Sequence, residues 1–332
     1  MRHLFVAVLT AFVSIPAIAT PTGVYFFGDS LTDVGNVTAV YATVPHPPGA
    51  PATIPGAPYD PEGRASNGPI YADVVAAGLG TGFSATPSVL GGNDFAFGGA
   101  RTRYQIFGAP FKGILDQVAS FTARPGPADS SALYVLWGGS NNLQDIILGK
   151  TSDVNGNPIP TVGQTISDLA SAIGALYADG ARKIFVPNVP DLALVPRVRE
   201  FGPAAQAGAH ALSVAFNAGL ASTLAALEAG LSGLDIIDFD TYANLNEVIA
   251  HKSLYGFTNT TSRCYTGDDT GFTGGGTVCA NPDEYLFWDG IHPTSALHTL
   301  LGERMLARIP EPTTLLLMTL ALGISCRVRA RR

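Results

Sequence analysis

Four short runs of apolar residues constrain the fold of this 332-residue chain more than any other feature; they are Val24–Gly28, Leu133–Trp137, Lys183–Pro187 and Leu234–Phe239. Within these runs apolar residues follow one another instead of alternating with polar ones, which is typical of strands buried on both faces. A weaker run of the same kind lies at Phe95–Phe97. The chain is therefore expected to form a sheet that is covered on both sides.

Between the strand-like runs, apolar residues recur at intervals of three or four, which is the period of one helix face. One such series runs from Val162 to Leu176 and another from Leu212 to Leu231. Strands that alternate with helices are joined by right-handed crossovers and pair in parallel. We therefore predict an α/β fold, a three-layer α/β/α sandwich with a flavodoxin-like parallel sheet.

The first predicted strand runs directly into Gly28-Asp29-Ser30-Leu31. Open parallel sheets bind ligands at the carboxyl ends of their strands, so Ser30 lies where chemistry is expected. A helix that begins just after this motif would direct backbone N–H groups at the same place. On its own, the motif is equally compatible with a serine that caps a helix.

A second motif, at residues 288–294, places Asp289 three residues before His292. A carboxylate at this spacing can accept the Nδ1–H of the imidazole, fix its tautomer and stabilise its charged form. The other ring nitrogen can then take a proton from a serine hydroxyl, so we predict a catalytic triad of Ser30, Asp289 and His292. A lone histidine would favour a solvated loop residue; the paired carboxylate favours catalysis.

Two further segments offer hydrogen-bond donors for the oxyanion of an acyl-transfer reaction. Residues 95–100 bring the backbone N–H of Gly98 or Gly99 to a strand end, and residues 138–142 bring the side-chain amide of Asn141. In isolation, the first segment could be a tight turn and the second an asparagine that caps a helix.

Taken together, the four segments resemble the GDSL or SGNH hydrolase family, with Ser30, Gly98, Asn141 and the Asp289–His292 pair in the expected order. The resemblance implies an SGNH hydrolase fold and hydrolysis of carboxylic esters through an acyl-serine intermediate, without a metal or cofactor. It also implies that the oxyanion is held by the N–H groups of Ser30 and Gly98 and by the amide of Asn141.

The resemblance covers about residues 23–308 and is closest to the phospholipase/lecithinase-like subgroup. It extends to the accessory residues Asp33, Gly35 and Asn36 and to residues 64–68. One departure is Asn142, which stands where the family often has aspartate. This change leaves the oxyanion donor in place and affects only its local bracing.

The sequence lacks the signatures of several other classes of function. A net charge of −7 disfavours a nucleic-acid-binding face. The sequence contains no Gly-x-Ser-x-Gly elbow, no phosphate-binding Walker A loop and no HExxH zinc motif. The remaining histidines have no metal-ligand spacing with cysteine, so solvated or capping roles are expected for them.

Residues 1–19 resemble a secretory signal, with Arg2, an apolar core from Leu4 to Val13, and an Ala17-Ile18-Ala19 site for signal peptidase. The alternative is a buried N-terminal strand. The signal predicts an exported protein whose hydrolase domain spans residues 20–309.

Residues 310–332 contain Pro310-Glu311-Pro312, an apolar stretch from Thr313 to Cys326, and four arginines. This tail resembles the PEP-CTERM sorting signal, which implies an exosortase-like processing enzyme and transient anchoring in the inner membrane. Its alternative is an ordinary terminal helix with a basic end.

Export also bears on the cysteines, because disulfides persist in oxidising compartments. Cys264 and Cys279 flank a glycine-rich insertion, while Cys326 lies in the tail. We therefore predict a Cys264–Cys279 disulfide.

The sequence thus predicts a secreted serine esterase or lipase that acts on an ester of a lipid, a small molecule or a glycan. Two alternatives stay open. The same site could serve as a polysaccharide O-acetylesterase or an acyltransferase, or the fold could belong to a non-catalytic matrix protein. The loops at 40–61 and 250–282 carry no motif that identifies the acyl chain length.

Overall fold

A computed structural model of the chain describes residues 20–46, 50–80 and 82–310. The predicted signal peptide at 1–19, and all but the first residue of the predicted tail at 310–332, lie outside the described residues. The elements described below belong to one compact unit, Pro21–Arg308.

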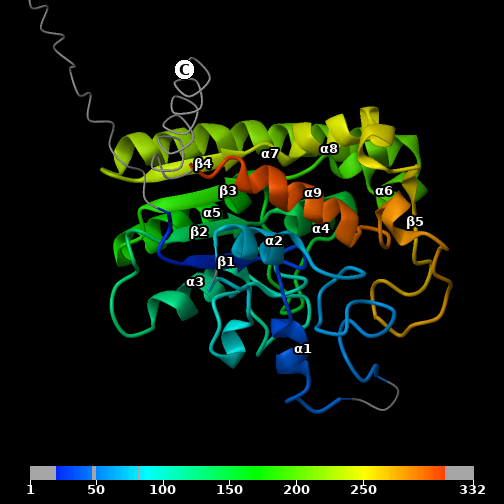
Figure 1. Cartoon of the computed structure of the whole chain (residues 1–332), viewed down its shortest axis with the longest axis horizontal. Helices are drawn as coiled ribbons and strands as arrows, with labels where there is room; N and C mark the ends of the chain where they lie inside the picture. Colours follow the sequence, from blue (N-terminus) through cyan, green and yellow to red (C-terminus); the bar gives the residue numbers. More distant parts are fainter. Residues whose placement is uncertain (1–19, 47–49, 81, 311–332) are drawn as a thin grey trace, which may run out of the picture. The chain divides into compact units, whose positions relative to one another are not determined.

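The centre of this unit is a parallel sheet with the strand order β1-β2-β3-β4 (Figure 1). Its strands are β1 Val24–Gly28, β2 Leu133–Trp137, β3 Lys183–Pro187 and β4 Asp235–Phe239. The prediction of a parallel sheet is confirmed, and the four strands coincide with the four apolar runs to within one residue. Every residue of β2 is buried, as expected for a central strand covered on both faces.

The weaker run at Phe95–Phe97 forms no regular strand, so that expectation is wrong in detail. The segment nevertheless lies alongside β1: Phe95 N–H donates to Phe26 O, and Phe97 N–H donates to Gly28 O. Ala96 O accepts the side-chain amide of Asn36, and the segment ends in the turn at Gly98–Gly99. If this segment is counted as a strand at the edge of the sheet, it is the second in the chain and β2, β3 and β4 become the third to fifth. The spatial order is then 2-1-3-4-5, which is the flavodoxin-like pattern.

Helices cover both faces of the sheet, as two neighbouring residues of β1 show. Successive side chains of a strand point to opposite faces. Phe26 packs edge-to-face on Tyr71 of α2 (Tyr71–Gly78), whereas Phe27 packs edge-to-face on Phe121 of α3 (Ile114–Thr122). Helix α9 (Ser295–Leu306) packs beside α2, and α5 (Val162–Asp179) lies between α3 and α7 (Pro203–Gly230), which gives the predicted three layers.

The remaining elements connect these layers. They are α1 Asn36–Tyr41, α4 Ser140–Ile147, α6 Pro196–Glu200, α8 Thr241–Ala250, the 3-10 helices η1 Ser88–Leu90, η2 Leu192–Leu194, η3 Lys252–Tyr255 and η4 Pro282–Glu284, and the strands β5 Asn259–Arg263 and β6 Tyr285–Phe287. Helix α7 is long and apolar enough, by length and composition alone, to cross a membrane, but it packs on α5 and β4 as part of the sandwich.

The predicted disulfide is present in the structure. Cys264 and Cys279 are bonded and close an insertion between β5 and β6. Both cysteines pack with Tyr59, Tyr265 and Trp288 in a cluster that we call the aromatic–disulfide cluster; Phe272 and Tyr285 pack against it. The bond closes the insertion on itself, and the packing of Tyr59 in this cluster joins the insertion to the proline-rich loop.

Replacing both cysteines by alanine should lower the stability of the domain. A disulfide that closes a loop of about 15 residues stabilises by ~3 kcal/mol in the chain-entropy model, which corresponds to a fall in Tm of roughly 5 °C for a domain of this size. Calorimetry with and without a reductant tests this. Reductant should lower the Tm of the wild-type protein and leave that of the double variant unchanged; equal sensitivity in both proteins would contradict the bond.

Candidate active site

Ser30 lies in a tight turn directly after β1. The turn is formed by the N–H groups of Thr32 and Asp33, which donate to the carbonyl of Asp29. Gly28 is required just before it, because a Cβ there would lie 2.5 Å from the carbonyl oxygen of Trp137 on β2. The N–H of Ser30 has no hydrogen-bond partner among the described residues, so it stays free for a ligand.

The expectation of a helix immediately after Ser30 is wrong. The next helix, α1, begins only at Asn36, because Asp33 interrupts the turn and accepts the first N–H groups of that helix. The donors that the sequence suggested for a ligand are thus used by Asp33. Burial raises the pKa of Asp33 to about 6, even though the N–H groups of Gly98, Gly35, Val37 and Asn36 donate to its carboxylate and lower it.

The loop between β6 and α9 holds Asp289 and His292. A backbone hydrogen bond of 2.8 Å from Trp288 N–H to His292 O closes the loop. Inside it, Asp289 Oδ1 accepts the N–H groups of Ile291 at 2.8 Å and His292 at 2.7 Å. Thr294 then caps α9 by accepting the N–H of Leu297, so the loop is anchored on both sides.

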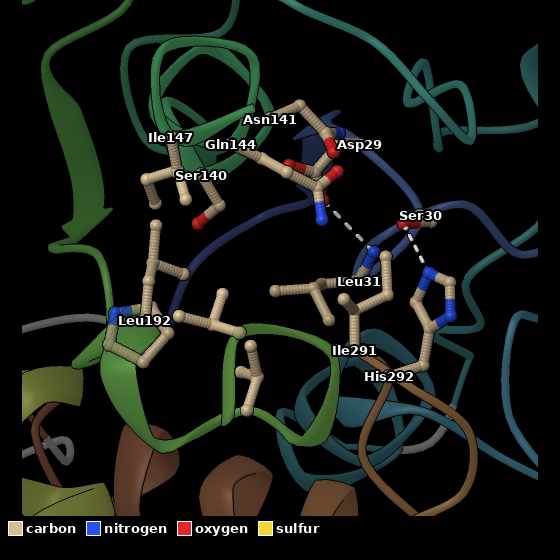
Figure 2. Close-up of a pocket in the computed structure, with 13 residues that line it drawn as sticks. Asp29, Ser30, Leu31, Ser140, Asn141, Gln144, Ile147, Leu192, Ile291 and His292 are labelled. Carbon is tan, nitrogen blue, oxygen red and sulfur yellow. Dashed lines mark hydrogen bonds between the residues drawn. The ribbon is translucent and has the colours of Figure 1, made fainter. Parts of the chain in front are cut away.

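Ser30, His292 and Asp289 form a continuous hydrogen-bonded chain. His292 Nε2 lies 2.8 Å from Ser30 Oγ, and His292 Nδ1 lies 2.6 Å from Asp289 Oδ2. Figure 2 shows the ring of His292 turned toward Ser30 at one end of a pocket. An ionised carboxylate can only accept, so Nδ1 carries the proton and Nε2 is the nitrogen that can accept one from Ser30.

Asp289 is fully buried, and its surroundings favour the ionised form. Burial alone would raise the pKa of Asp289, but the charge of His292, its ring N–H and the backbone N–H groups of His292 and Ile291 hold the pKa below its usual value. The carboxylate is therefore available to orient His292 at neutral pH. Asp29, beside the serine, behaves in the opposite way, since burial raises its pKa to about 6.

The structure also shows which backbone donors near Ser30 are free. The N–H of Gly98 donates to Asp33 Oδ2 at 2.8 Å, which weighs against Gly98 as the oxyanion donor. The N–H of the neighbouring Gly99 has no hydrogen-bond partner within the described chain, which favours the alternative kept open above. Gly99 has a φ of 80°, a conformation in which glycine avoids strain.

Asn141 lies in the first turn of α4, at the carboxyl end of β2. Its Nδ2 donates to Ala100 O at 3.0 Å, so one of its two amide hydrogens remains for a ligand. The adjacent Asn142, at the position where the family often has aspartate, still braces this region: its Oδ1 accepts the N–H of Thr102 at 3.1 Å.

A buried ion pair holds the two oxyanion segments together, and the sequence analysis did not find it. Arg101 donates to both carboxylate oxygens of Asp145 at 2.7 and 2.6 Å, and to Gly99 O at 2.8 Å. Asp145 is on α4, one turn after Asn141, and also accepts the hydroxyl of Tyr104. A single guanidinium thus fixes the turn of Gly99 against the helix of Asn141.

Two cavities of unequal size meet at Ser30, Asn141 and His292. The larger has a volume of about 380 Å³ and is lined by apolar side chains, among them Ile106 and Phe272, and by charged ones, among them Lys150 and Arg197. The smaller, of about 60 Å³, lies between α4 and the segment after β3 (Figure 2). Among the described residues, no group of three or more His, Cys, Asp and Glu side chains is placed to hold a metal ion.

Comparison with known proteins identifies the family of this chain. The family described as GDSL-like Lipase/Acylhydrolase matches residues 24–305, a range that includes every site residue named above. The chain belongs to this family. Membership makes hydrolysis of an ester the chemistry expected of the site.

Curated relatives in the family are similar over most of their length. A GDSL esterase/lipase of Arabidopsis thaliana is 27% identical over 92% of this chain and 92% of its own. Another relative from the same plant is named inactive GDSL esterase/lipase-like protein 25; it is 27% identical over 86% of this chain and 71% of its own.

A solved structure with a similar fold is that of an acetyl xylan esterase from Geobacillus stearothermophilus. It is 15% identical, covers 86% of this chain and 94% of its own, and has a TM-score of 0.45.

Replacing Arg101 by methionine should destabilise the domain by up to about 3–5 kcal/mol, because the buried carboxylate of Asp145 loses its two-point partner and keeps only Lys150 and Tyr104 among the described residues. Arg103→Met is the matched control. It removes a pair with Asp168 whose arginine is half-exposed, so we expect a cost of roughly 1–2 kcal/mol. Chemical denaturation of both variants gives the comparison, and similar losses in the two would contradict a special role for the buried pair.

Proposed function

We propose that this chain is a secreted serine hydrolase that cleaves carboxylic esters through an acyl-serine intermediate. The observation that carries the proposal is the chain of hydrogen bonds from Ser30 Oγ through His292 to Asp289. A serine hydroxyl is a weak nucleophile at neutral pH, and a neutral imidazole oriented by a carboxylate is the usual means of activating it.

In the first half of the reaction, Ser30 Oγ attacks the ester carbonyl carbon while its proton passes to His292 Nε2. The negative charge that develops on the carbonyl oxygen is held by the N–H groups of Ser30 and Gly99 and by the Asn141 amide, with Gly99 in place of Gly98. His292 then returns the proton to the departing alcohol. In the second half, water attacks the acyl-serine with the same base, which releases the acid and restores Ser30.

The alternative of a non-catalytic protein remains relevant, since one relative carries a name that describes it as inactive. The intact arrangement of the three side chains supports catalysis instead. Export is part of the proposal: it rests on residues 1–19 and on the tail at 310–332, and the Cys264–Cys279 bond is consistent with an oxidising compartment.

Ser30→Ala should abolish labelling by a fluorophosphonate probe and lower kcat for any ester substrate by at least roughly 10³-fold. The fold should be unchanged, since one small residue replaces another in the turn. Ser171→Ala is the control, because Ser171 is exposed on α5 and lines neither cavity. Mass spectrometry of labelled protein and ester assays test this. Wild-type turnover by well-folded Ser30→Ala protein would refute the triad, and a wild-type protein with neither label nor turnover would favour the non-catalytic alternative.

The size of the smaller cavity favours a short-acyl ester as the substrate over a long-chain lipid. A volume of about 60 Å³ holds about four to six water-sized groups at 10–15 Å³ each. Its walls include Leu31, Ile147 and Leu192, so an acetyl to butyryl group fits its size and polarity. The larger cavity then receives the alcohol part of the ester, so an acetylated glycan or small molecule is favoured over a long-chain lipid.

If the acyl group occupies the smaller cavity, kcat/KM in a series of p-nitrophenyl esters should fall steeply beyond about four to six carbons. Ile147→Ala, which enlarges only the smaller cavity, should move this limit to longer chains. The adjacent Leu148→Ala alters only the larger cavity and should leave the limit in place. Preference for long chains in the wild-type protein, with a limit that responds to Leu148 instead, would support the lipase alternative.

A further inference from the structure

We propose that Tyr59 is a positioning residue of the triad, whose hydroxyl holds the Asp289 carboxylate in the orientation that His292 needs. The hydroxyl donates to Asp289 Oδ2 at 2.7 Å, and the same oxygen accepts His292 Nδ1–H at 2.6 Å. The inference rests on the proposed function, since it assigns Tyr59 a role in activating Ser30. It extends the hydrogen-bonded chain to a fourth side chain, from the proline-rich loop.

The hydrogen bonds of Asp289 show why this hydroxyl matters. Within the described residues, its Oδ1 accepts two backbone N–H groups of its own loop, whereas its Oδ2 accepts only side chains, those of His292 and Tyr59. A carboxylate offers about four acceptor sites, so all of them are used. Without the hydroxyl, the oxygen that faces His292 would keep a single partner, and a buried charge would lose one of its four donors.

The direction of the hydrogen bond follows from chemistry. An ionised carboxylate has no proton to give, so the phenol must be the donor. Burial, followed by the nearby charge of Asp289, raises the pKa of Tyr59 far above its usual value, which keeps the hydroxyl protonated. Tyr59 therefore acts as a fixed donor and does not take part in proton transfer.

The ring of Tyr59 is held by the aromatic–disulfide cluster. It packs edge-to-face against Tyr265, Phe272 and Trp288, with ring centroids 5.5, 5.3 and 6.1 Å away. Trp288 directly precedes Asp289, so the cluster positions the donor and the acceptor through neighbouring residues. This packing fixes the orientation of the ring and therefore the position of the hydroxyl, unlike that of a tyrosine on the surface.

Tyr59→Phe tests the proposal, because it removes only the hydroxyl and keeps the ring in the cluster. We expect kcat to fall by roughly tenfold to a hundredfold, the effect of one hydrogen bond to a charged group, with KM nearly unchanged. We also expect a change in the low-field proton NMR resonance of His292 Nδ1–H, because both donors share Asp289 Oδ2. That resonance can be assigned by its absence in His292→Ala.

Tyr265→Phe is the matched control. Tyr265 belongs to the same cluster and is also buried, but its hydroxyl has no hydrogen-bond partner in the described part of the chain. The same chemical change should therefore leave kcat, KM and the resonance at their wild-type values. If both tyrosine variants lose activity to the same extent, the effect comes from packing and the positioning role is wrong.

A second comparison uses Asp289→Ala as the background. If Tyr59 acts through the carboxylate, adding Tyr59→Phe to that variant should cost no further activity. A full additional loss, or wild-type kcat and an unchanged resonance in Tyr59→Phe alone, would overturn the proposal. The resonance needs no turnover, so it tests Tyr59 even if no ester proves to be a substrate; absence of labelling at Ser30 would instead refute the proposed function.

Discussion

The central strands of this domain are covered by helices on both faces. Their side chains are therefore inaccessible to a ligand, and the strands themselves cannot carry the reactive groups. Polar side chains can appear only where each strand ends, and in a parallel sheet those ends lie along one edge. Ser30 follows β1, Asn141 follows β2, and the turn at Gly98–Gly99 follows the segment beside β1. The sheet thereby brings together a nucleophile and oxyanion donors that lie far apart in the sequence.

Buried carboxylates then decide which of the nearby donors stay free. Asp33 uses the N–H groups at the start of α1 and that of Gly98, and Asp145 holds Arg101 between the two oxyanion segments. The donors that remain available to a ligand around Ser30 are the N–H groups of Ser30 and Gly99 and one hydrogen of the Asn141 amide. The site is therefore defined as much by the hydrogen bonds that the protein satisfies internally as by those it leaves open.

The sequence predicted the four strands, the two long helices, the disulfide and the residues that meet at Ser30, because each depends on a local pattern or motif. It did not predict Arg101–Asp145 or Tyr59–Asp289, since these pairs join segments 44 and 230 residues apart and nothing in the local sequence marks them. The sequence left the choice between Gly98 and Gly99 open for a related reason: it depends on competition by Asp33 for one N–H, which appears only when the chain is folded.

The separation of Ser30 and His292 along the chain, 262 residues, also has a consequence in time. At the usual rate of synthesis, about 5–20 residues per second, the serine leaves the ribosome roughly 13–50 s before its histidine. Tyr59 likewise leaves the ribosome 230 residues before Asp289, its hydrogen-bond partner. A nascent or truncated chain thus holds an unactivated serine, and reactivity arises only when the two ends of the domain close on each other.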